Sequence, residues 1–265
     1  MIPFYKKVFE ATAAWWGNVL KVNDNKELIM PTIKEGINHY GSYSKLKEWA
    51  APADTDMTKY DLLIPVRWGE RKNGKTLAWA VTEYRHPKSQ RPISGYIGVE
   101  EYGNGLWELN TDKKIAFQKA MSVFIHEFGH IIAFNAWKNF QEKNLYTIND
   151  GGEKKYYWKG KKAVEVAKNY YKCSGDFKGL PLQKMPTGEL GGHWELDWFG
   201  PEGMSPEEGT EPEIFSAMTL ALCEDSGWYQ VDYGMAENYE FGKDTGCENK
   251  NCAKQFCNPE TDKGY

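Results

Sequence analysis

Two histidines and a glutamate stand at a spacing that can hold and use a metal ion. His126 and His130 are four positions apart, with Glu127 directly after the first, inside the apolar run 122–134. In an α-helix, residues i and i+4 lie on one face, one turn apart. Two imidazoles placed in this way can bind one Zn²⁺, and the carboxylate can act as general base toward a metal-bound water. The spacing therefore predicts a zinc hydrolase.

A catalytic zinc site needs a third protein ligand and an open position for water. His193 follows His130 after a long interval, and Gly191 and Gly192 before it would let the backbone approach a metal closely. Taken alone, such a histidine also fits a surface loop. Met204 stands in a Gly- and Pro-rich segment shortly afterwards, and a methionine in a tight turn beneath three zinc histidines is a feature of metzincin proteases. Taken alone, it fits a core residue better.

Four further stretches carry a more specific likeness. The chain resembles the leishmanolysin family of metzincin proteases, in which the third histidine follows a long insertion and stands in a segment similar to Gly-His-Trp-Glu. The resemblance runs from about position 60 to Cys247. The matching stretches are 91–97, 170–182, 191–195 and 218–233, followed by 235–237 and 242–243.

This resemblance implies a zinc endopeptidase with one catalytic Zn²⁺ and a protein or peptide substrate. Met218 has the right residue type for the methionine beneath the metal, but it lies inside an expected helix, where we predict a core residue. By resemblance, the zinc ligands are His126, His130 and His193, the general base is Glu127 and the methionine under the site is Met204.

The pattern of apolar residues predicts an α+β fold, with strands before most of the helices. We expect loop at 103–110, a solvated surface at 139–162 and a Gly/Pro-rich passage at 174–209. The expected strands are 61–66, 76–84 and 93–99; the expected helices are 5–22, 163–171, 212–225 and a long one that is capped at Thr111–Asp112 and carries the histidine pair to about Ala133.

The resemblance adds a metzincin-like architecture to this outline. It implies a twisted mixed sheet with helices above, a mostly helical or irregular lower subdomain, and an active-site cleft between them. We expect residues 1–135 to form the catalytic subdomain with the sheet and the zinc-binding helix. Residues 136–265 would hold the insertion, the third histidine, the methionine turn, the last helix and a Cys-rich tail.

Substrate is expected to bind in extended form along 93–99, taken as an edge strand to which it adds a further strand. The net charge of −4 offers no basic surface for nucleic acid. No apolar run approaches the roughly 18 residues that cross a bilayer. We expect a monomer located outside the cell or at its surface, with cytoplasmic location the weaker alternative.

The five cysteines favour disulfides in an oxidising compartment over a second zinc site, because no fourth ligand completes a zinc knuckle. Cys223 stands where the family carries a larger apolar residue, and we expect a buried free thiol there. The sequence leaves open how the others pair, which are Cys173, Cys247, Cys252 and Cys257.

Ala133 stands where the family usually has glycine, so the helix is expected to continue through Trp137 with the ligand geometry preserved. Because a signal, a pro-segment and a long C-terminal part are not recognisable, the chain resembles a trimmed catalytic region. The alternatives are a catalytically impaired, zinc-containing binding protein of the family, and another zinc hydrolase with Glu142 or Glu153 as third ligand and His193 on the surface. A structural protein with a chance motif is the last alternative.

Overall fold

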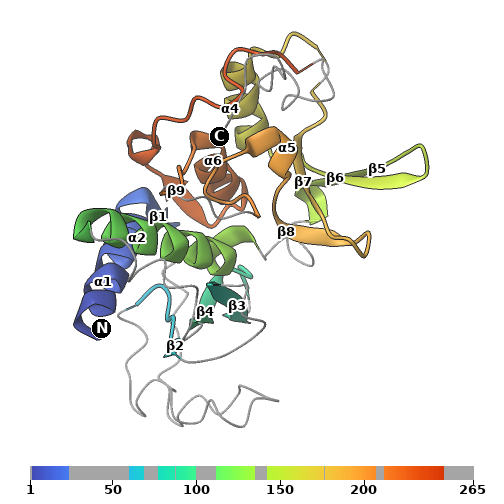
Figure 1. The fold of residues 1–265 in the computed structure, drawn as a ribbon. Coiled ribbons are helices and arrows are strands. Elements are labelled where there is room, and N and C mark those ends of the chain that lie inside the picture. Colours follow the sequence, from blue (N-terminus) through green and yellow to red (C-terminus); the bar gives the residue numbers. More distant parts are fainter. Residues whose placement is uncertain are drawn as a thin grey trace.

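The structure is a computed structural model with helices and strands in both halves of the chain (Figure 1). Within the described residues the strands form three small sheets, and helices pack beside them. The predicted α+β class is confirmed, but strands are not confined to the first half of the chain. The loop predicted at 103–110 lies outside the described residues, which are 2–23, 60–68, 77–86, 88–99, 112–134, 142–175, 177–206 and 212–247.

The first sheet lies beside the helix that carries two of the histidines. It consists of β2 (Val66–Trp68), β4 (Pro92–Val99) and β3 (Ala78–Arg85) in that spatial order. β2 runs parallel to β4, whereas β3 is antiparallel to it, so the sheet is mixed. The strands predicted at 76–84 and 93–99 are confirmed as β3 and β4.

The position of β4 corrects the predicted mode of substrate binding. β4 lies between β2 and β3, so neighbouring strands occupy both of its edges. The prediction that substrate adds a strand to 93–99 is therefore wrong, because a pattern of residue types identifies a strand but not its neighbours. The strand predicted at 61–66 is also largely wrong. It forms only a bridge between Leu63 and Ser94 before β2 begins.

The N-terminal helix packs against the histidine-bearing helix. α1 (Ile2–Val19) ends earlier than predicted, because β1 (Leu20–Val22) follows and pairs antiparallel with β9 (Tyr229–Val231). Trp16 in α1 donates a hydrogen bond from Nε1 to the carbonyl oxygen of Ile125 at 3.2 Å. The N-terminal segment is thus fixed both to the histidine-bearing helix and to the last strand.

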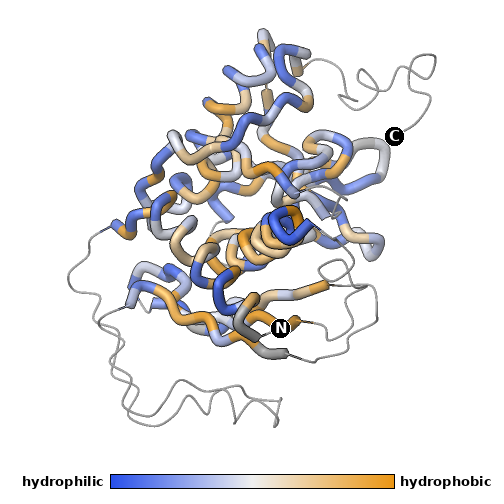
Figure 2. The backbone as a smooth tube through the Cα atoms, turned by 60° about the vertical axis from the view of Figure 1, so that its left-hand side comes forward, coloured by the Kyte–Doolittle hydropathy of each residue, from blue (hydrophilic) through white to orange (hydrophobic). Residues whose placement is uncertain are grey.

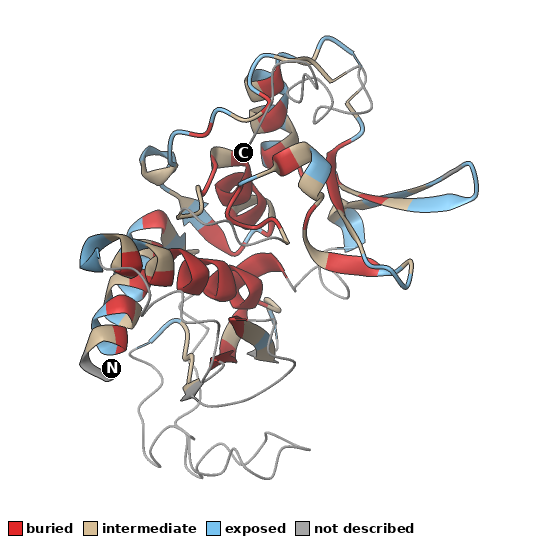
Figure 3. Ribbon diagram, viewed as in Figure 1, coloured by how far each residue is buried: buried red, intermediate tan, exposed pale blue. Residues whose placement is uncertain are grey.

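The histidine-bearing helix is α2 (Lys113–Gly129), and it begins at the predicted cap. The Asp112 carboxylate accepts hydrogen bonds from the backbone N–H groups of Lys114 and Ile115, which the first turn leaves without intrahelical partners. The C-terminal half of α2 is almost continuously buried (Figure 3). This burial removes the candidate histidines from bulk water.

The winding changes where α2 reaches its second histidine. The segment η3 (His130–Phe134) continues α2 as a π-helix, a form that is frequent at functional sites. Ala133 lies within η3, and its φ is not positive, so the helix continues there without a left-handed residue. The extension predicted through Trp137 falls outside the described residues.

The second sheet carries the third histidine and was not predicted. Its four antiparallel strands lie in the order β5-β6-β7-β8, and η4 (Glu142–Asn144) precedes them. The strands are β5 (Leu145–Asp150), β6 (Glu153–Trp158), β7 (Leu180–Lys184) and β8 (Leu190–Trp194).

The Gly/Pro-rich passage predicted at 174–209 contains β7 and β8, and the polar segment 139–162 contains β5 and β6. The solvated surface predicted at 139–162 is confirmed for its described residues, because charged side chains such as those of Glu142, Lys154 and Lys159 are exposed. The hairpin of β5 and β6 extends from the molecule and is exposed toward its tip (Figure 3). Because little of β5 is buried, its sequence lacks the alternation that predicts a strand. Gly151-Gly152, where the chain turns, was the available signal for a hairpin.

The last long helix begins later than predicted. A start at Pro212 is wrong, because Ser216 caps the helix and its hydroxyl accepts from the backbone N–H of Thr219. The helix ends just before Gly227, as predicted, where φ is +77°. The helix predicted at 163–171 is confirmed as α4. The remaining elements are α4 (Lys161–Tyr171), α5 (Leu196–Phe199), α6 (Ala217–Asp225) and η5 (Tyr233–Met235).

A disulfide joins Cys173, after α4, to Cys247 near the end of the described chain. Cys223 is buried in α6 and unbonded, which confirms the predicted free thiol. Burial raises the pKa of the Cys223 thiol, so it stays protonated and unreactive. Cys252 and Cys257 lie outside the described residues.

The buried hydrophobic cluster includes many residues of α2, η3 and α6. Hydrophobic segments gather in the interior of the molecule (Figure 2). No helix in the described ranges has both the length and the apolar character that a bilayer span requires.

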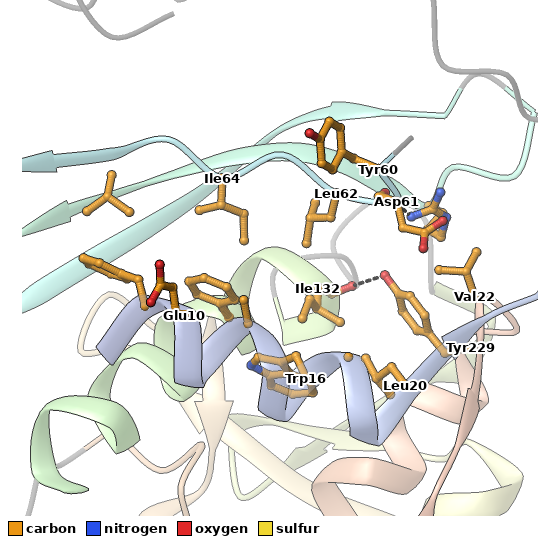
Figure 4. A pocket seen from close by; sticks show the side chains of 16 residues that line it. Glu10, Trp16, Leu20, Val22, Tyr60, Asp61, Leu62, Ile64, Ile132 and Tyr229 are labelled. Atoms are coloured by element: carbon orange, nitrogen blue, oxygen red, sulfur yellow. Dashed lines mark hydrogen bonds between the residues drawn. The ribbon is translucent and has the colours of Figure 1, made fainter. Parts of the chain in front are cut away.

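A pocket of about 590 Å³ lies between α1 and the first sheet (Figure 4). Leu62, Ile64 and Trp16 line it, together with Phe128 and Ile132 of the α2–η3 helix. Phe128 and Ile132 each stand two positions after a candidate histidine, so they face about 200° away from it around the helix. The pocket is therefore separate from the histidines.

Candidate metal centre

Three histidine side chains from different elements meet at one point. His126 lies in α2, His130 begins η3 and His193 lies in β8. Nε2 of His130 is 3.0 Å from Nε2 of His126 and 3.1 Å from Nε2 of His193, and the third pair is 3.3 Å apart. Nitrogens that share one tetrahedral zinc at about 2.0–2.1 Å lie roughly 3.3–3.4 Å from one another. The three nitrogens are therefore close to the spacing that a single zinc ion requires.

The outer nitrogens determine where the ring protons lie. Nδ1 of His126 is 2.6 Å from the carbonyl oxygen of Gly203, and Nδ1 of His193 is 2.8 Å from Oε1 of Gln183. Since a carbonyl oxygen only accepts, each Nδ1 carries the proton and donates it. Nε2 of both rings then presents a lone pair to the cluster. Converging lone pairs repel one another unless a cation lies between them, so the donor set fits a metal ion.

Burial keeps the three imidazoles neutral. It lowers the pKa of His126 to about 4, and the bond to Gly203 only partly opposes this change. Burial, followed by the proximity of His126, lowers the pKa of His193 to about 3. The pKa of His130 also lies well below its usual value, through burial and then its two histidine neighbours. At neutral pH all three rings are therefore uncharged, as metal ligands must be.

The other two predicted site residues lie in α2 or pack against it. Glu127 follows His126 in α2 and is only 4% exposed. Met204 is fully buried, and a Cβ atom on Gly129 would come within 2.7 Å of its Sδ. The glycine thus leaves room for Met204 to pack directly under the helix between Glu127 and His130. Met218 is buried in α6, as predicted for a core residue.

The alternative carboxylate ligands lie elsewhere. Glu142 is exposed in η4, and Glu153 is exposed in β6, where it pairs with Lys184. Of the candidates for the third position, only His193 lies beside His126 and His130. Among the described residues, these three histidines are the one group of three or more metal-ligating side chains close enough to share an ion.

A model of the leishmanolysin family of peptidases matches residues 25–260, which is most of the chain. The chain belongs to the leishmanolysin family. This match confirms the family resemblance inferred from the histidine pair and the Gly-His-Trp-Glu segment.

Leishmanolysin of Leishmania donovani is 25% identical to the chain over 199 residues, which are 74% of this chain and 31% of that protein. A leishmanolysin-like peptidase of Drosophila pseudoobscura pseudoobscura is 46% identical over 87 residues, which cover 32% of this chain and 12% of the relative. For the leishmanolysin-like peptidase of Caenorhabditis briggsae the identity is 34% over 88 residues, covering 33% of this chain and 13% of the relative. The matches thus span less than a third of these curated relatives' own length.

The residues that orient the histidines in this leishmanolysin-family chain were not predicted. Gln183 and Gly203 supply the acceptors, and neither stands near a histidine in sequence. Gly191 was expected to bring the backbone close to the metal, but it has a different function. A Cβ atom there would lie 2.3 Å from Oε1 of Gln183, so the glycine leaves room for the side chain that orients His193. A glycine two residues before a candidate ligand histidine was the available signal.

Replacing Gln183 with leucine should weaken zinc binding by about 10–100-fold, the range typical for losing a residue that orients a ligand. Leucine has a similar volume but cannot accept the Nδ1 proton of His193. The measurement is a competition titration of Zn²⁺ against a chromophoric chelator. Gln230→Leu, at an exposed position of β9, is the control and should bind zinc like the wild type. Equal affinity in the two variants would show that Gln183 does not orient the ligand.

Proposed function

We propose that this chain hydrolyses internal peptide bonds as a zinc endopeptidase, with His126, His130 and His193 as the ligands of one Zn²⁺. The observation that carries the proposal is the convergence of three neutral imidazoles, with a buried glutamate directly after the first of them in α2. When bound, the ion would supply a Lewis acid that polarises a carbonyl group and lowers the pKa of a coordinated water to about 7.

In this proposal Glu127 is the general base. Its carboxylate takes a proton from the attacking water and later passes it to the leaving amine. Met204 forms the floor beneath the ligand helix, which it contacts at Gly129. The alternative of a catalytically impaired binding protein is not favoured, because every chemical group that the reaction needs is present. Ala133, the departure nearest to the site, lies within η3.

We further propose that the site lies in a metzincin-like cleft between residues 1–135 and residues 136–265. The candidate ligands come from both parts, since α2 and η3 supply two histidines and β8 supplies the third. Closure of the site would then require both parts to fold together.

We infer that a protein or peptide substrate binds in extended form along the outer edge of β3. Within the described residues, β3 is an outer strand of its sheet. It also lies beside the ligand helix, because Thr82 Oγ1 donates to the carbonyl oxygen of Ile131 in η3 at 3.2 Å. An added strand would obtain main-chain hydrogen bonds from β3 while its side chains supply specificity. A location outside the cell or at its surface is supported by the Cys173–Cys247 disulfide.

Removing zinc tests the proposed function. A fluorogenic peptide library should be digested by the wild-type protein, and a chelator should abolish this digestion because Glu127 alone cannot activate water sufficiently. Adding Zn²⁺ back after removal of the chelator should restore the activity. A serine-protease inhibitor is the control and should have no effect. The zinc content of the chelator-treated protein should fall below about one ion per ten chains. Digestion that persists at this zinc content would contradict a zinc mechanism.

A further inference from the structure

A carboxylate is buried next to the methionine turn without a cationic partner. Glu202 is 1% exposed, and no ion pair involves it within the described part of the chain. Burying a carboxylate is unfavourable unless hydrogen bonds replace the lost water. Glu202 accepts four such bonds, from the backbone N–H of Met204, from the backbone N–H and hydroxyl of Ser216, and from the hydroxyl of Thr219.

The two oxygens of Glu202 hold different parts of the chain. Oε2 accepts from Met204 N at 2.7 Å, inside the turn that follows α5. Oε1 accepts from Ser216 N at 3.0 Å and from Ser216 Oγ at 2.8 Å, at the N-terminus of α6. The side chain therefore ties the turn to a helix that is itself part of the core. An amide could not do the same, because its NH₂ group would face one of these backbone donors.

The same turn contacts both elements that carry the histidines. The carbonyl oxygen of Gly203 accepts from Nδ1 of His126 at 2.6 Å, on α2. The carbonyl oxygen of Met204 accepts from the backbone N–H of Trp194 at 3.0 Å, on β8, directly after His193. The direction of two of the three ligand rings therefore depends on where this turn is held.

We propose that Glu202 is a positioning residue of the metal centre, which holds the turn so that Gly203 aims His126 and Met204 aligns the strand of His193. This inference rests on the proposed function, because it assumes that the three histidines bind a metal. It adds that the affinity for the metal depends on a carboxylate that touches neither the ion nor a ligand ring. Thr219 belongs to the same arrangement, since its hydroxyl also accepts from Trp194 Nε1 at 2.8 Å.

The test compares Glu202→Gln with Asp225→Asn. Asp225 is a matched control, because its carboxylate accepts three hydrogen bonds, from Trp158 Nε1, Lys162 N and Ala163 N, but joins α6 to α4 away from the histidines. Zn²⁺ affinity is measured by chelator competition, and Co²⁺ bound in place of zinc reports ligand geometry through its visible spectrum. Glu202→Gln should bind both ions about 10–100-fold more weakly, with an altered Co²⁺ spectrum. Asp225→Asn should match the wild type in both.

Thr219→Val serves if Glu202→Gln does not fold. It keeps the carboxylate and the side-chain shape, loses one of the four bonds to Glu202 together with the bond from Trp194 Nε1, and should weaken Zn²⁺ binding in the same direction. A folded Glu202→Gln protein with wild-type affinity and spectrum would overturn the inference, and so would an equal loss in Asp225→Asn. Both outcomes leave the proposed function intact, provided that the wild type binds zinc and digests peptides. A wild type that binds no zinc would overturn the proposed function as well.

Discussion

Replacing Glu127 with alanine should reduce kcat/KM for peptide hydrolysis by at least about 100-fold while zinc remains bound, since general base catalysis contributes roughly 10²–10⁴-fold. Glu127 is buried in α2 directly after His126, and the candidate ligands do not include it. The substitution therefore removes the proton acceptor and keeps the metal. Hydrolysis of a fluorogenic peptide and the zinc content per chain, measured on the same sample, check the two halves of this prediction.

Two further variants test whether Glu127 acts as the general base. Glu127→Gln has nearly the shape of the wild-type side chain and should lose activity to a similar extent, so that altered packing cannot account for the loss. Glu165→Ala, at an exposed position of α4, is the control and should keep full activity. Undiminished hydrolysis by zinc-loaded Glu127→Ala would rule out Glu127 as the base.

Replacing both Cys173 and Cys247 with serine should lower the free energy of unfolding by about 4 kcal/mol, from the entropy of closing a long loop in the unfolded chain. The two cysteines are 74 positions apart, and the loop between them contains β7, β8 and the third histidine. Denaturant unfolding of the wild type and the double variant, followed by Trp fluorescence, measures the difference.

A reducing agent provides the control for the disulfide. It should lower the denaturant midpoint of the wild type to that of the double variant and leave the double variant unchanged. Cys223 does not confuse this comparison, because it is buried and unbonded. Coincident unfolding curves for the oxidised wild type and the double variant would show that the bond contributes no stability.

Because β4 is not an edge strand, residues that determine cleavage specificity should be sought on another strand of the first sheet. The β-branched and aromatic residues of 93–99 identified it as a strand, but residue types carry no information on which strands flank it. In the structure β4 is the central strand, and β3 is the outer strand that contacts η3 through Thr82. Under the proposed binding along β3, substitutions intended to alter cleavage preference belong on that strand, where Val81 is exposed.

Much of the ligand helix could be predicted because its determinants are local. The four-residue spacing of His126 and His130 places both on one helical face, and Asp112 caps that helix through bonds to the next few residues. The second sheet could not be predicted in the same way. Its outer strand, β5, is largely exposed, so burial imposes no alternation on its sequence.

By itself, then, the sequence determined the kind of chemistry. It contains two histidines and a glutamate on one helix, a third histidine in a family-specific segment, and the methionine that follows it. Tertiary structure alone decided how these groups are held. Gln183 meets His193 through the pairing of β7 with β8, and Gly203 meets His126 from a turn that Glu202 joins to α6. These contacts join residues far apart in sequence, and their geometry depends on strand register and core packing, which no local pattern encodes.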